Sequence, residues 1–360
     1  MSLQSSIHNL SQSSNTAVFK NRSNPITPTD QSTPKIPEVS TQTVSNHPKI
    51  KQNVYYIVSV TIFNSTFTHV VLVKEAKPSC FNKLYLPAGK VEPNENLIEA
   101  AKREVLEEAG IVDVELTTLV SIEEQGVRWL RFNFVGKIRD ETTELLKSVP
   151  DKETLSAEWY PVESVLELND LFKNRKTLNR EQTIFKKSFR CLDILSTIQE
   201  AYQISKHVIP QNIFIKILPN VGDSYENCSV RLIMSCKTEK NTYFIATENS
   251  NLLPEVLIPI RPTVEDLVSE RVMNYMQTCI IGDWSKNHEK IIFAGIVGVH
   301  HSGKNGCDGI RFDAVFEFTG GELPKISADM YSWVEVGDGS SRVLDLVKNN
   351  GLYAPALKHA

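Results

Sequence analysis

Residues 89–111 read GKVEPNENLIEAAKREVLEEAGI, and this stretch decides both the fold and the chemistry of the chain. On a helix with about 3.6 residues per turn, its apolar residues form one stripe that comprises Ile98, Ala101, Val105 and Ala109. The carboxylates of Glu104, Glu107 and Glu108 stand beside that stripe at positions i, i+3 and i+4, so they converge. Arg103 lies four residues before Glu107 and can pair with it. We therefore predict an amphipathic helix that carries an acidic cluster.

Three converging carboxylates repel one another and are hard to hold together unless a cation shares them. A set of oxygen ligands favours a hard ion, either Mg²⁺ or Mn²⁺. Such an ion completes its coordination shell with water and substrate phosphates, so the cluster indicates a phosphorylated substrate. The alternative is a solvated helix face, because helices rich in Glu, Lys and Arg are common. The carboxylates alone leave both interpretations open.

The spacing around the acidic cluster is more specific than the cluster itself. Gly89 is followed after five residues by Glu95, and after seven more by Arg103-Glu104-Val105-Leu106-Glu107-Glu108-Ala109-Gly110-Ile111. This pattern matches every specified position of the Nudix box, and the sequence therefore resembles a Nudix hydrolase. The resemblance implies an α/β fold, namely an α/β/α sandwich with a mixed central sheet. In that fold the box forms a loop–helix–loop that binds a divalent metal ion, Mg²⁺ with Mn²⁺ as a substitute, against a diphosphate.

The resemblance also implies a role for each residue of the box. The implied metal ligands are Glu104 and Glu108, with Glu107 close by and a main-chain carbonyl from the Ala88-Gly89 turn. Arg103 would orient a glutamate, and Glu95 would brace the loop that leads into the helix.

The implied reaction is attack by an activated water on a phosphorus of a nucleoside diphosphate. It needs a lowered water pKa, neutralised phosphate oxygens and one carboxylate that accepts a proton. That base comes either from the box, where Glu107 and Glu108 are candidates, or from a later loop. Glu153 and Glu158 are the loop candidates, and the sequence does not choose between them.

Flanking segments narrow the resemblance to an animal subgroup, the 8-oxo-dGDP phosphatases, over roughly residues 54–205. The segments that carry it are 54–77, 85–93, 121–126, 129–132 and 157–161. This implies hydrolysis of 8-oxo-dGDP to 8-oxo-dGMP and phosphate, which sanitises the nucleotide pool. The alternatives are a Nudix pyrophosphatase for ADP-ribose or dinucleotides, and a non-catalytic nucleotide-binding module with regulatory function.

A purine pocket needs a flat apolar wall with a few hydrogen-bonding groups. The candidates for this substrate wall are Leu86, Trp129, Phe132 and Trp159. The alternative for each of them is ordinary core packing at strand spacing.

Composition limits the remaining possibilities. The chain has 360 residues with 39 Lys+Arg against 43 Asp+Glu, a net charge of −4, which argues against a nucleic-acid partner. No apolar run approaches the ~18 residues that a membrane span needs. The six cysteines show no CxxC spacing, so we expect reduced thiols and a cytoplasmic protein. The polar N-terminus leaves mitochondrial import as the weaker alternative. Oligomeric state is open.

The length favours two domains. We expect a disordered tail over 1–50, a Nudix domain over 51–165, a helical connection over 166–208, a degenerate Nudix-like domain over 209–350 and a tail over 351–360. Strands are expected at 54–63, 68–73, 84–86, 115–123, 129–138 and 157–162, and amphipathic segments at 165–172 and 189–207. The box helix is expected to have Asn94 as its N-cap and to end at Gly110.

Internal similarity supports the second domain. Residues 309–316 echo 129–136, and residues 327–334 echo 156–163. Alignment from Glu265 places Met273, Asn274, Gln277 and Thr278 at the positions of Arg103, Glu104, Glu107 and Glu108. This half is therefore not expected to bind the catalytic metal. His300-His301 is interpreted as loop residues, because no third ligand follows at a suitable spacing.

Overall fold

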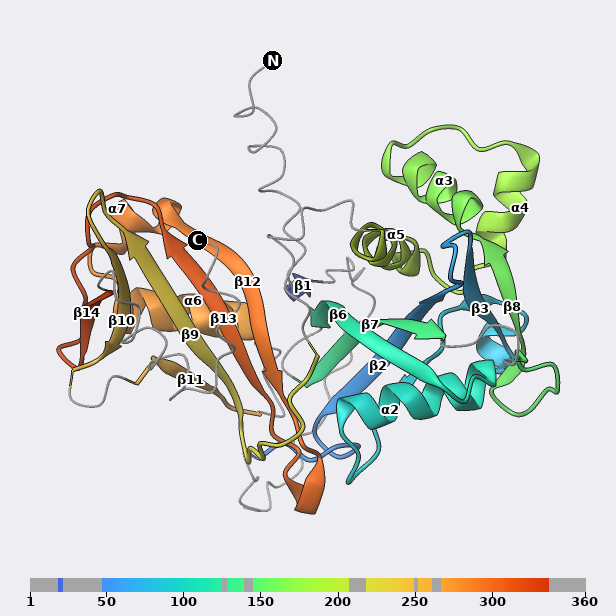
Figure 1. Cartoon of the computed structure of the whole chain (residues 1–360), viewed down its shortest axis with the longest axis horizontal. Helices are drawn as coiled ribbons and strands as arrows, with labels where there is room; N and C mark the ends of the chain where they lie inside the picture. Colours follow the sequence, from blue (N-terminus) through green and yellow to red (C-terminus); the bar gives the residue numbers. More distant parts are fainter. Residues whose placement is uncertain are drawn as a thin grey trace, which may run out of the picture.

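The computed structural model describes residues 19–21, 47–124, 128–138, 145–206, 218–248, 252–260 and 267–336. These residues form two mixed β-sheets that lie side by side (Figure 1). The first sheet has the strand order β1-β6-β7-β2-β3-β4, with β5 paired to β2 and β8 paired to β3. The second sheet has the order β12-β13-β9-β10-β14, with β11 paired to β9. We call the residues of the first sheet and its helices, up to 206, the first half, and residues 218–336 the second half.

The strands of the first half are β1 (Phe19–Asn21), β2 (Tyr55–Phe63), β3 (His69–Glu75), β4 (Leu84–Tyr85), β5 (Ala88–Lys90), β6 (Val114–Glu124), β7 (Trp129–Ile138) and β8 (Thr154–Pro161). Its helices are η1 (Pro78–Cys80), α2 (Leu97–Glu104), its π-helical continuation η2 (Val105–Ala109), α3 (Val162–Lys173), α4 (Arg180–Ser188) and α5 (Asp193–Ser205). Helix α2 covers one face of the sheet and α5 lies on the opposite side (Figure 1). The first half is therefore the expected three-layer α/β/α arrangement.

Most of the predicted strands are confirmed within two or three residues, and β7 coincides with its prediction. Strand β1 falls within the predicted tail and pairs in parallel with Ile122–Glu124, and residues 47–50 are also ordered, so the prediction of an unstructured segment over 1–50 is wrong there. The predicted connection over 166–208 contains α3, α4 and α5 up to residue 206, and α5 buries Ile194 and Leu195 in the core. These helices belong to the first half. Residues 351–360 lie outside the described part.

The box helix begins two residues later than predicted. Asn94 has a left-handed φ of 67° and lies in the turn before the helix, so it cannot serve as the N-cap. Asn96 is the N-cap: its side chain accepts from the Ile98 and Glu99 amides at 3.0 Å, and Glu99 bonds back to its amide. Gly110 ends the helix with φ 77°, as predicted.

The second half repeats the central strand pairings of the first half and its α-helix with a π-helical continuation. Its strands are β9 (Cys228–Lys237), β10 (Thr242–Thr247), β11 (Glu255–Ile258), β12 (Ile291–His300), β13 (Arg311–Phe318) and β14 (Tyr331–Val336). Its helices are α6 (Val268–Tyr275), the π-helical η3 (Met276–Ile280), α7 (Trp284–Asn287), η4 (His288–Lys290) and η5 (Lys304–Gly306). The parallel pair β9–β13 corresponds to β2–β7, and the α6–η3 helix corresponds to α2–η2.

Strand register fixes the equivalent residues in the two halves. Both β6–β7 and β12–β13 carry two register shifts at the same spacing, so Phe132 matches Phe312 and residue 133 matches residue 313. The helices align with Val105 at the position of Met276. This moves the predicted alignment of the box by one residue, and the positions of Arg103, Glu104, Glu107 and Glu108 are held by Asn274, Tyr275, Thr278 and Cys279. The expected absence of carboxylates at these four positions holds in either register.

The predicted echo of residues 156–163 in 327–334 needs a larger correction. Val70 pairs with Tyr160 in the first sheet, and the equivalent Phe244 pairs with Val334 in the second. The match is thus displaced by three residues, so Trp333 of β14 occupies the position that Trp159 has in β8. A loop of different length before the strand explains the shift.

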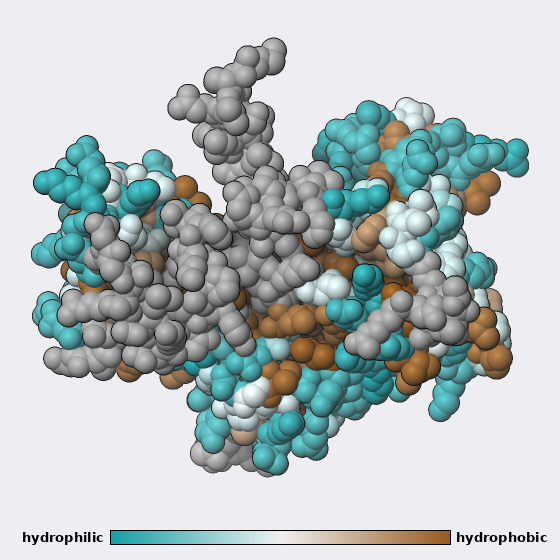
Figure 2. Space-filling view, in the orientation of Figure 1, coloured by the Kyte–Doolittle hydropathy of each residue, from teal (hydrophilic) through white to brown (hydrophobic). Residues whose placement is uncertain are grey.

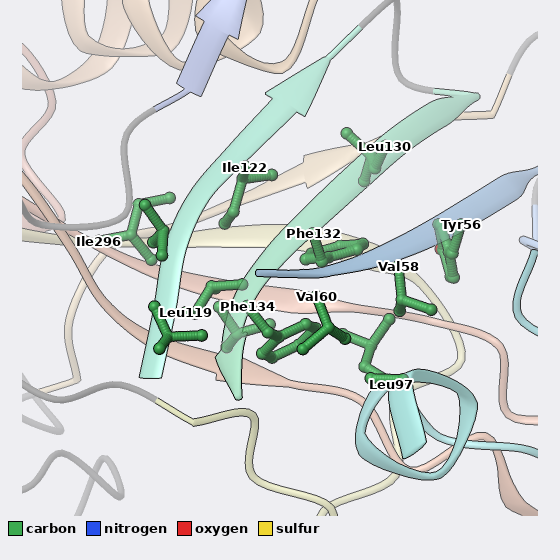
Figure 3. Packing of buried hydrophobic residues seen from close by; sticks show 14 of the residues in the cluster. Tyr56, Val58, Val60, Leu97, Leu119, Ile122, Leu130, Phe132, Phe134 and Ile296 are labelled. Carbon is green, nitrogen blue, oxygen red and sulfur yellow. The ribbon is translucent and has the colours of Figure 1, made fainter. Parts of the chain in front are cut away.

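The two halves meet through equivalent surfaces. Phe132 stacks on its counterpart Phe312 with ring centroids 6.4 Å apart. The Tyr56 hydroxyl contacts the thiol of Cys228, its own counterpart, at 3.3 Å. One hydrophobic cluster runs through both halves, and Figure 3 shows Ile296 of β12 among the core residues of β2, β6 and β7. Contacts between equivalent residues are typical of an isologous interface, so the chain resembles a dimer joined into one polypeptide.

The surface agrees with this arrangement. In the view of Figure 2 hydrophilic residues dominate the periphery of both halves, and apolar residues gather toward the middle. The six cysteines, all within the described residues, form no disulfide with one another. Among the described residues, no helix combines the length and the apolar character that a membrane span requires.

Two polar groups are buried where the halves meet. Glu124, at the end of β6, accepts from the Val268 amide and the Ser269 hydroxyl at 2.7 Å each, and so caps α6, which has no side-chain cap of its own. His301, the counterpart of Glu124, is fully buried with its ring edge-on to Tyr56, the centroids 5.4 Å apart. Neither ring nitrogen of His301 has a hydrogen-bond partner among the described residues.

Burial without partners makes His301 sensitive to pH. Desolvation lowers the pKa of His301 to about 4, so the ring stays neutral in the folded chain. The unfolded chain binds the proton at about pH 6.5, so the free energy of unfolding should fall on acidification between about pH 6.5 and 4. One extra proton bound on unfolding corresponds to about 1.4 kcal/mol per pH unit.

We expect His301→Phe, which keeps a ring against Tyr56 and cannot titrate, to flatten this pH dependence. Urea unfolding of both chains between pH 7.5 and 4.5 measures the effect. Because both chains share all other titrating groups, the difference between the two curves isolates His301. Parallel curves would show that His301 does not carry the acid sensitivity.

Candidate active site

The guanidinium of Arg103 connects several residues of the box. Its Nε and Nη2 donate to the two carboxylate oxygens of Glu95 at 2.8 and 2.9 Å. Its Nη1 donates to Glu104 at 2.7 Å and to Glu107 at 3.0 Å, and Nη2 also reaches the Lys90 carbonyl at 3.0 Å. These charge-assisted bonds raise the pKa of Arg103 further, so its charge is permanent. The predicted pairing with Glu107 is therefore one of three ion pairs of Arg103. The bidentate pair is made with Glu95.

Glu104 points from α2 into the protein and lies against the backbone of Gly89. Only 6 % of Glu104 is exposed, and a Cβ added at Gly89 would overlap its carboxylate. Burial raises the pKa of Glu104, while the hydrogen bond and charge of Arg103 act in the opposite direction. The glycine of the box is thus needed here because a carboxylate occupies the space of a side chain.

Glu108 is the second buried carboxylate. It is 4 % exposed, and its Oε2 accepts from the Ala88 amide at 2.8 Å. Burial raises the pKa of Glu108 to about 8, opposed by the Ala88 hydrogen bond and reinforced by the nearby charge of Glu104. Ala88 and Gly89 lie in strand β5 and not in the predicted turn, because they pair with Ser59 and Val58 of β2.

The chemistry of these donors fits a hard divalent cation. Two buried carboxylates face the short β5 strand, and burial opposes the ionisation of both, so a cation beside them would favour the charged forms. Glu107 differs, because its side chain is 57 % exposed. Within the described ranges, no three His, Cys, Asp or Glu side chains are gathered closely enough to hold a metal ion.

The two loop candidates for the base lie in different surroundings. Glu153 pairs with Lys77 at 2.9 Å, and its charge contributes to the raised pKa of Glu104. The charge of Glu108 in turn raises the pKa of Lys77. Glu158 lies on β8 and pairs with Lys74 at 2.5 Å, which lowers its pKa. Glu153 is therefore the loop carboxylate that is coupled to the box.

The four residues predicted as a purine wall do not form one surface. Leu86 and Phe132 are 1 % and 0 % exposed, and Phe132 packs against Phe312 between the halves. These two belong to the core, as the alternative interpretation held. Trp129 and Trp159 are only partly buried, but they lie on β7 and β8, which are separated by β2 and β3 in the sheet.

A buried polar network on the sheet was missed by the sequence analysis. Arg131 of β7 bonds to Glu123 and Asp193 at 2.5 Å each and also donates to the Tyr85 hydroxyl. Asn133 donates to Glu123 and to Ser121 at 3.0 Å. The signal was present in the sequence, because polar residues alternate with apolar ones along both β6 and β7.

The fold and the geometry of the box define a class of protein. A family model described as the NUDIX domain matches residues 56–180. The Danio rerio protein named 8-oxo-dGDP phosphatase NUDT18 is 30 % identical over 330 residues, which cover 84 % of this chain and 88 % of that protein. The chain therefore belongs to the Nudix hydrolase family.

Two further relatives align with this chain over different lengths. The Homo sapiens protein named 8-oxo-dGDP phosphatase NUDT18 is 28 % identical over 80 % of this chain and 82 % of its own length. The Caenorhabditis elegans protein named putative nudix hydrolase 1 is 36 % identical over 44 % of this chain and 40 % of its own length. The similarity to the phosphatases thus extends beyond the box into the second half.

The place of Glu104 against Gly89 gives a direct test of the cation site. Gly89 does not have a left-handed backbone, so Ala at this position is opposed only by overlap with the Glu104 carboxylate. We expect Gly89→Ala to weaken Mn²⁺ binding roughly 10- to 100-fold, measured by electron paramagnetic resonance of free Mn²⁺. Urea unfolding of the same variant controls for a general loss of structure. Unchanged Mn²⁺ affinity in a folded variant would contradict the site.

Proposed function

We propose that this chain hydrolyses oxidised purine nucleoside diphosphates, converting 8-oxo-dGDP to 8-oxo-dGMP and phosphate, with Mg²⁺ as the cofactor and Mn²⁺ as a substitute. The observation that carries the proposal is the pair of buried carboxylates, Glu104 and Glu108, held against β5 beside Arg103. The choice of substrate rests on relatives named 8-oxo-dGDP phosphatase that align with 80 % or more of the chain.

The residues of the chain have separable roles in this reaction. Glu104 and Glu108, with Glu107 at the exposed edge, are the groups that would hold the cation, and Arg103 fixes Glu104 and Glu107 in place. When bound, the cation lowers the pKa of a water molecule and neutralises phosphate oxygens. Water adds to the terminal phosphorus, and the bond from that phosphorus to the bridging oxygen breaks.

The proton that the water loses needs an acceptor. Glu153 is our candidate, because it is exposed, and its charge acts on Glu104. Lys77, paired with Glu153 at 2.9 Å, holds the Glu153 carboxylate near the site. Glu158 is held by Lys74 on the neighbouring strand and serves as the matched control.

We expect Glu108→Gln, which preserves shape and removes charge, to reduce kcat by at least ~10²-fold. Glu153→Gln should reduce kcat by ~10²-fold with a smaller effect on Mn²⁺ binding. Glu158→Gln, which also removes a partly exposed Lys–Glu ion pair, should change kcat by less than about twofold. Phosphate release from 8-oxo-dGDP measures all three. Full activity of a folded Glu108→Gln chain would show that the Glu108 carboxylate is not needed for catalysis, against the proposal.

A substrate panel separates the proposal from its alternatives. We expect kcat/KM to be higher for 8-oxo-dGDP than for 8-oxo-dGTP, ADP-ribose or a dinucleotide. A preference for ADP-ribose or a dinucleotide would keep the Nudix chemistry and change the substrate. Absence of turnover on every compound, with nucleotide binding retained, would favour the non-catalytic regulatory module.

A further inference from the structure

The second half contacts the first turn of the catalytic helix through the loop that follows β12, which we call the 301–309 loop. Gly303 in this loop has a left-handed φ of 65°. A Cβ added at Gly303 would overlap the carbonyl oxygen of Glu95 and lie 3.0 Å from the Asn96 amide nitrogen. The two backbones are therefore so close that only glycine fits between the halves at this point.

The two contacted residues, Glu95 and Asn96, hold other parts of the box in place. Glu95 holds the guanidinium fork of Arg103 through two hydrogen bonds, and Asn96 is the N-cap of α2. Arg103 in turn binds Glu104 and Glu107. The path from Gly303 to the carboxylates therefore passes through two residues, Glu95 and Arg103.

The 301–309 loop is fixed at several points. Ser302 shares a hydrogen bond with Ser224 at 2.8 Å, and the His301 amide donates to the Asn220 carbonyl at 3.0 Å. At its far end, Asp308 accepts from the Ile50 amide at 2.8 Å and, through its carbonyl, from the Tyr56 hydroxyl at 3.0 Å. The loop is therefore held by both halves and can resist movement of the turn that it contacts.

The first half makes a corresponding contact with the start of helix α6 in the second half. Glu124, the counterpart of His301, reaches across to cap α6 at Val268 and Ser269. Each half therefore supports the start of the other half's helix, but only α2 continues into a cluster of carboxylates. Only the contact of the second half with the start of α2 therefore bears on the catalytic carboxylates.

We propose that the second half is a positioning element for the catalytic helix: the 301–309 loop, at Gly303, sets the place of Glu95 and thereby orients Arg103 and the carboxylates that it holds. This inference rests on the proposed function for its effect on turnover. Its effect on cation affinity is independent of the substrate.

Two glycines of the same loop provide a matched pair of variants. Gly306 also has a left-handed φ, 72°, but nothing lies within 4 Å of a Cβ added there. Gly303→Ala and Gly306→Ala therefore introduce similar backbone strain, and only the first overlaps Glu95. We expect Gly303→Ala to weaken Mn²⁺ binding by roughly tenfold and to raise the Mg²⁺ concentration for half-maximal hydrolysis correspondingly. Gly306→Ala should change both by less than about twofold.

Electron paramagnetic resonance of free Mn²⁺ gives the affinity without any substrate. Equal Mn²⁺ affinities for the Gly303 and Gly306 variants would overturn the proposal. If Gly303→Ala does not fold, Gly303→Asn is compared with Gly306→Asn, because Asn accepts the left-handed backbone and leaves only the overlap. A wild-type chain that binds Mn²⁺ and hydrolyses no nucleotide would refute the proposed function, while the difference between the two glycines would still test the positioning role.

Discussion

One guanidinium organises the catalytic half of this protein. Arg103 makes ion pairs with three carboxylates, two of them on its own helix and one, Glu95, on the turn that leads into it. Removing Arg103 would leave the buried carboxylate of Glu104 without its charged partner, which is strongly destabilising. The start of α2, the strand β5 and the acidic side chains are therefore set together, and the site is sensitive to whatever contacts the Glu95 turn.

The second half keeps the fold and the interface of the catalytic half but lacks the carboxylates of the box. The topology, the two register shifts and even the π-helical end of the helix are repeated, whereas the four box positions hold Asn274, Tyr275, Thr278 and Cys279. The equivalent surfaces are retained, with Phe132 on Phe312 and Tyr56 on Cys228. Loss of the acidic cluster with retention of the interface is consistent with a half that supports its neighbour.

The sequence predicted the parts of the structure that local patterns determine. The box helix, its end at Gly110 and strand β7 follow from spacing, glycine geometry and residue type. The N-cap was predicted two residues early, because both Asn94 and Asn96 are suitable caps and only the backbone conformation distinguishes them. The internal repeat was recognised, and its match of residues 309–316 to 129–136 is confirmed. The registers of the box and of the strand at 156–163 were displaced, because loops of different length are not visible in residue type.

Contacts between the halves were beyond prediction from one sequence. Phe132 has the alternation of a strand residue, and nothing in that pattern distinguishes a substrate wall from a surface buried against Phe312. The cap that Glu124 provides to Val268 and the approach of Gly303 to Glu95 join distant parts of the chain, so no local signal marks them. Both contacts depend on how two folded units dock.

We propose that the first half holds a cation and that the second half holds none in the equivalent place. Anomalous scattering from crystals soaked in Mn²⁺ tests this directly. We predict a peak beside the carboxylates of Glu104 and Glu108, next to the backbone of β5, and none at residues 274–279. A peak at residues 274–279, or none beside Glu104 and Glu108, would contradict the account.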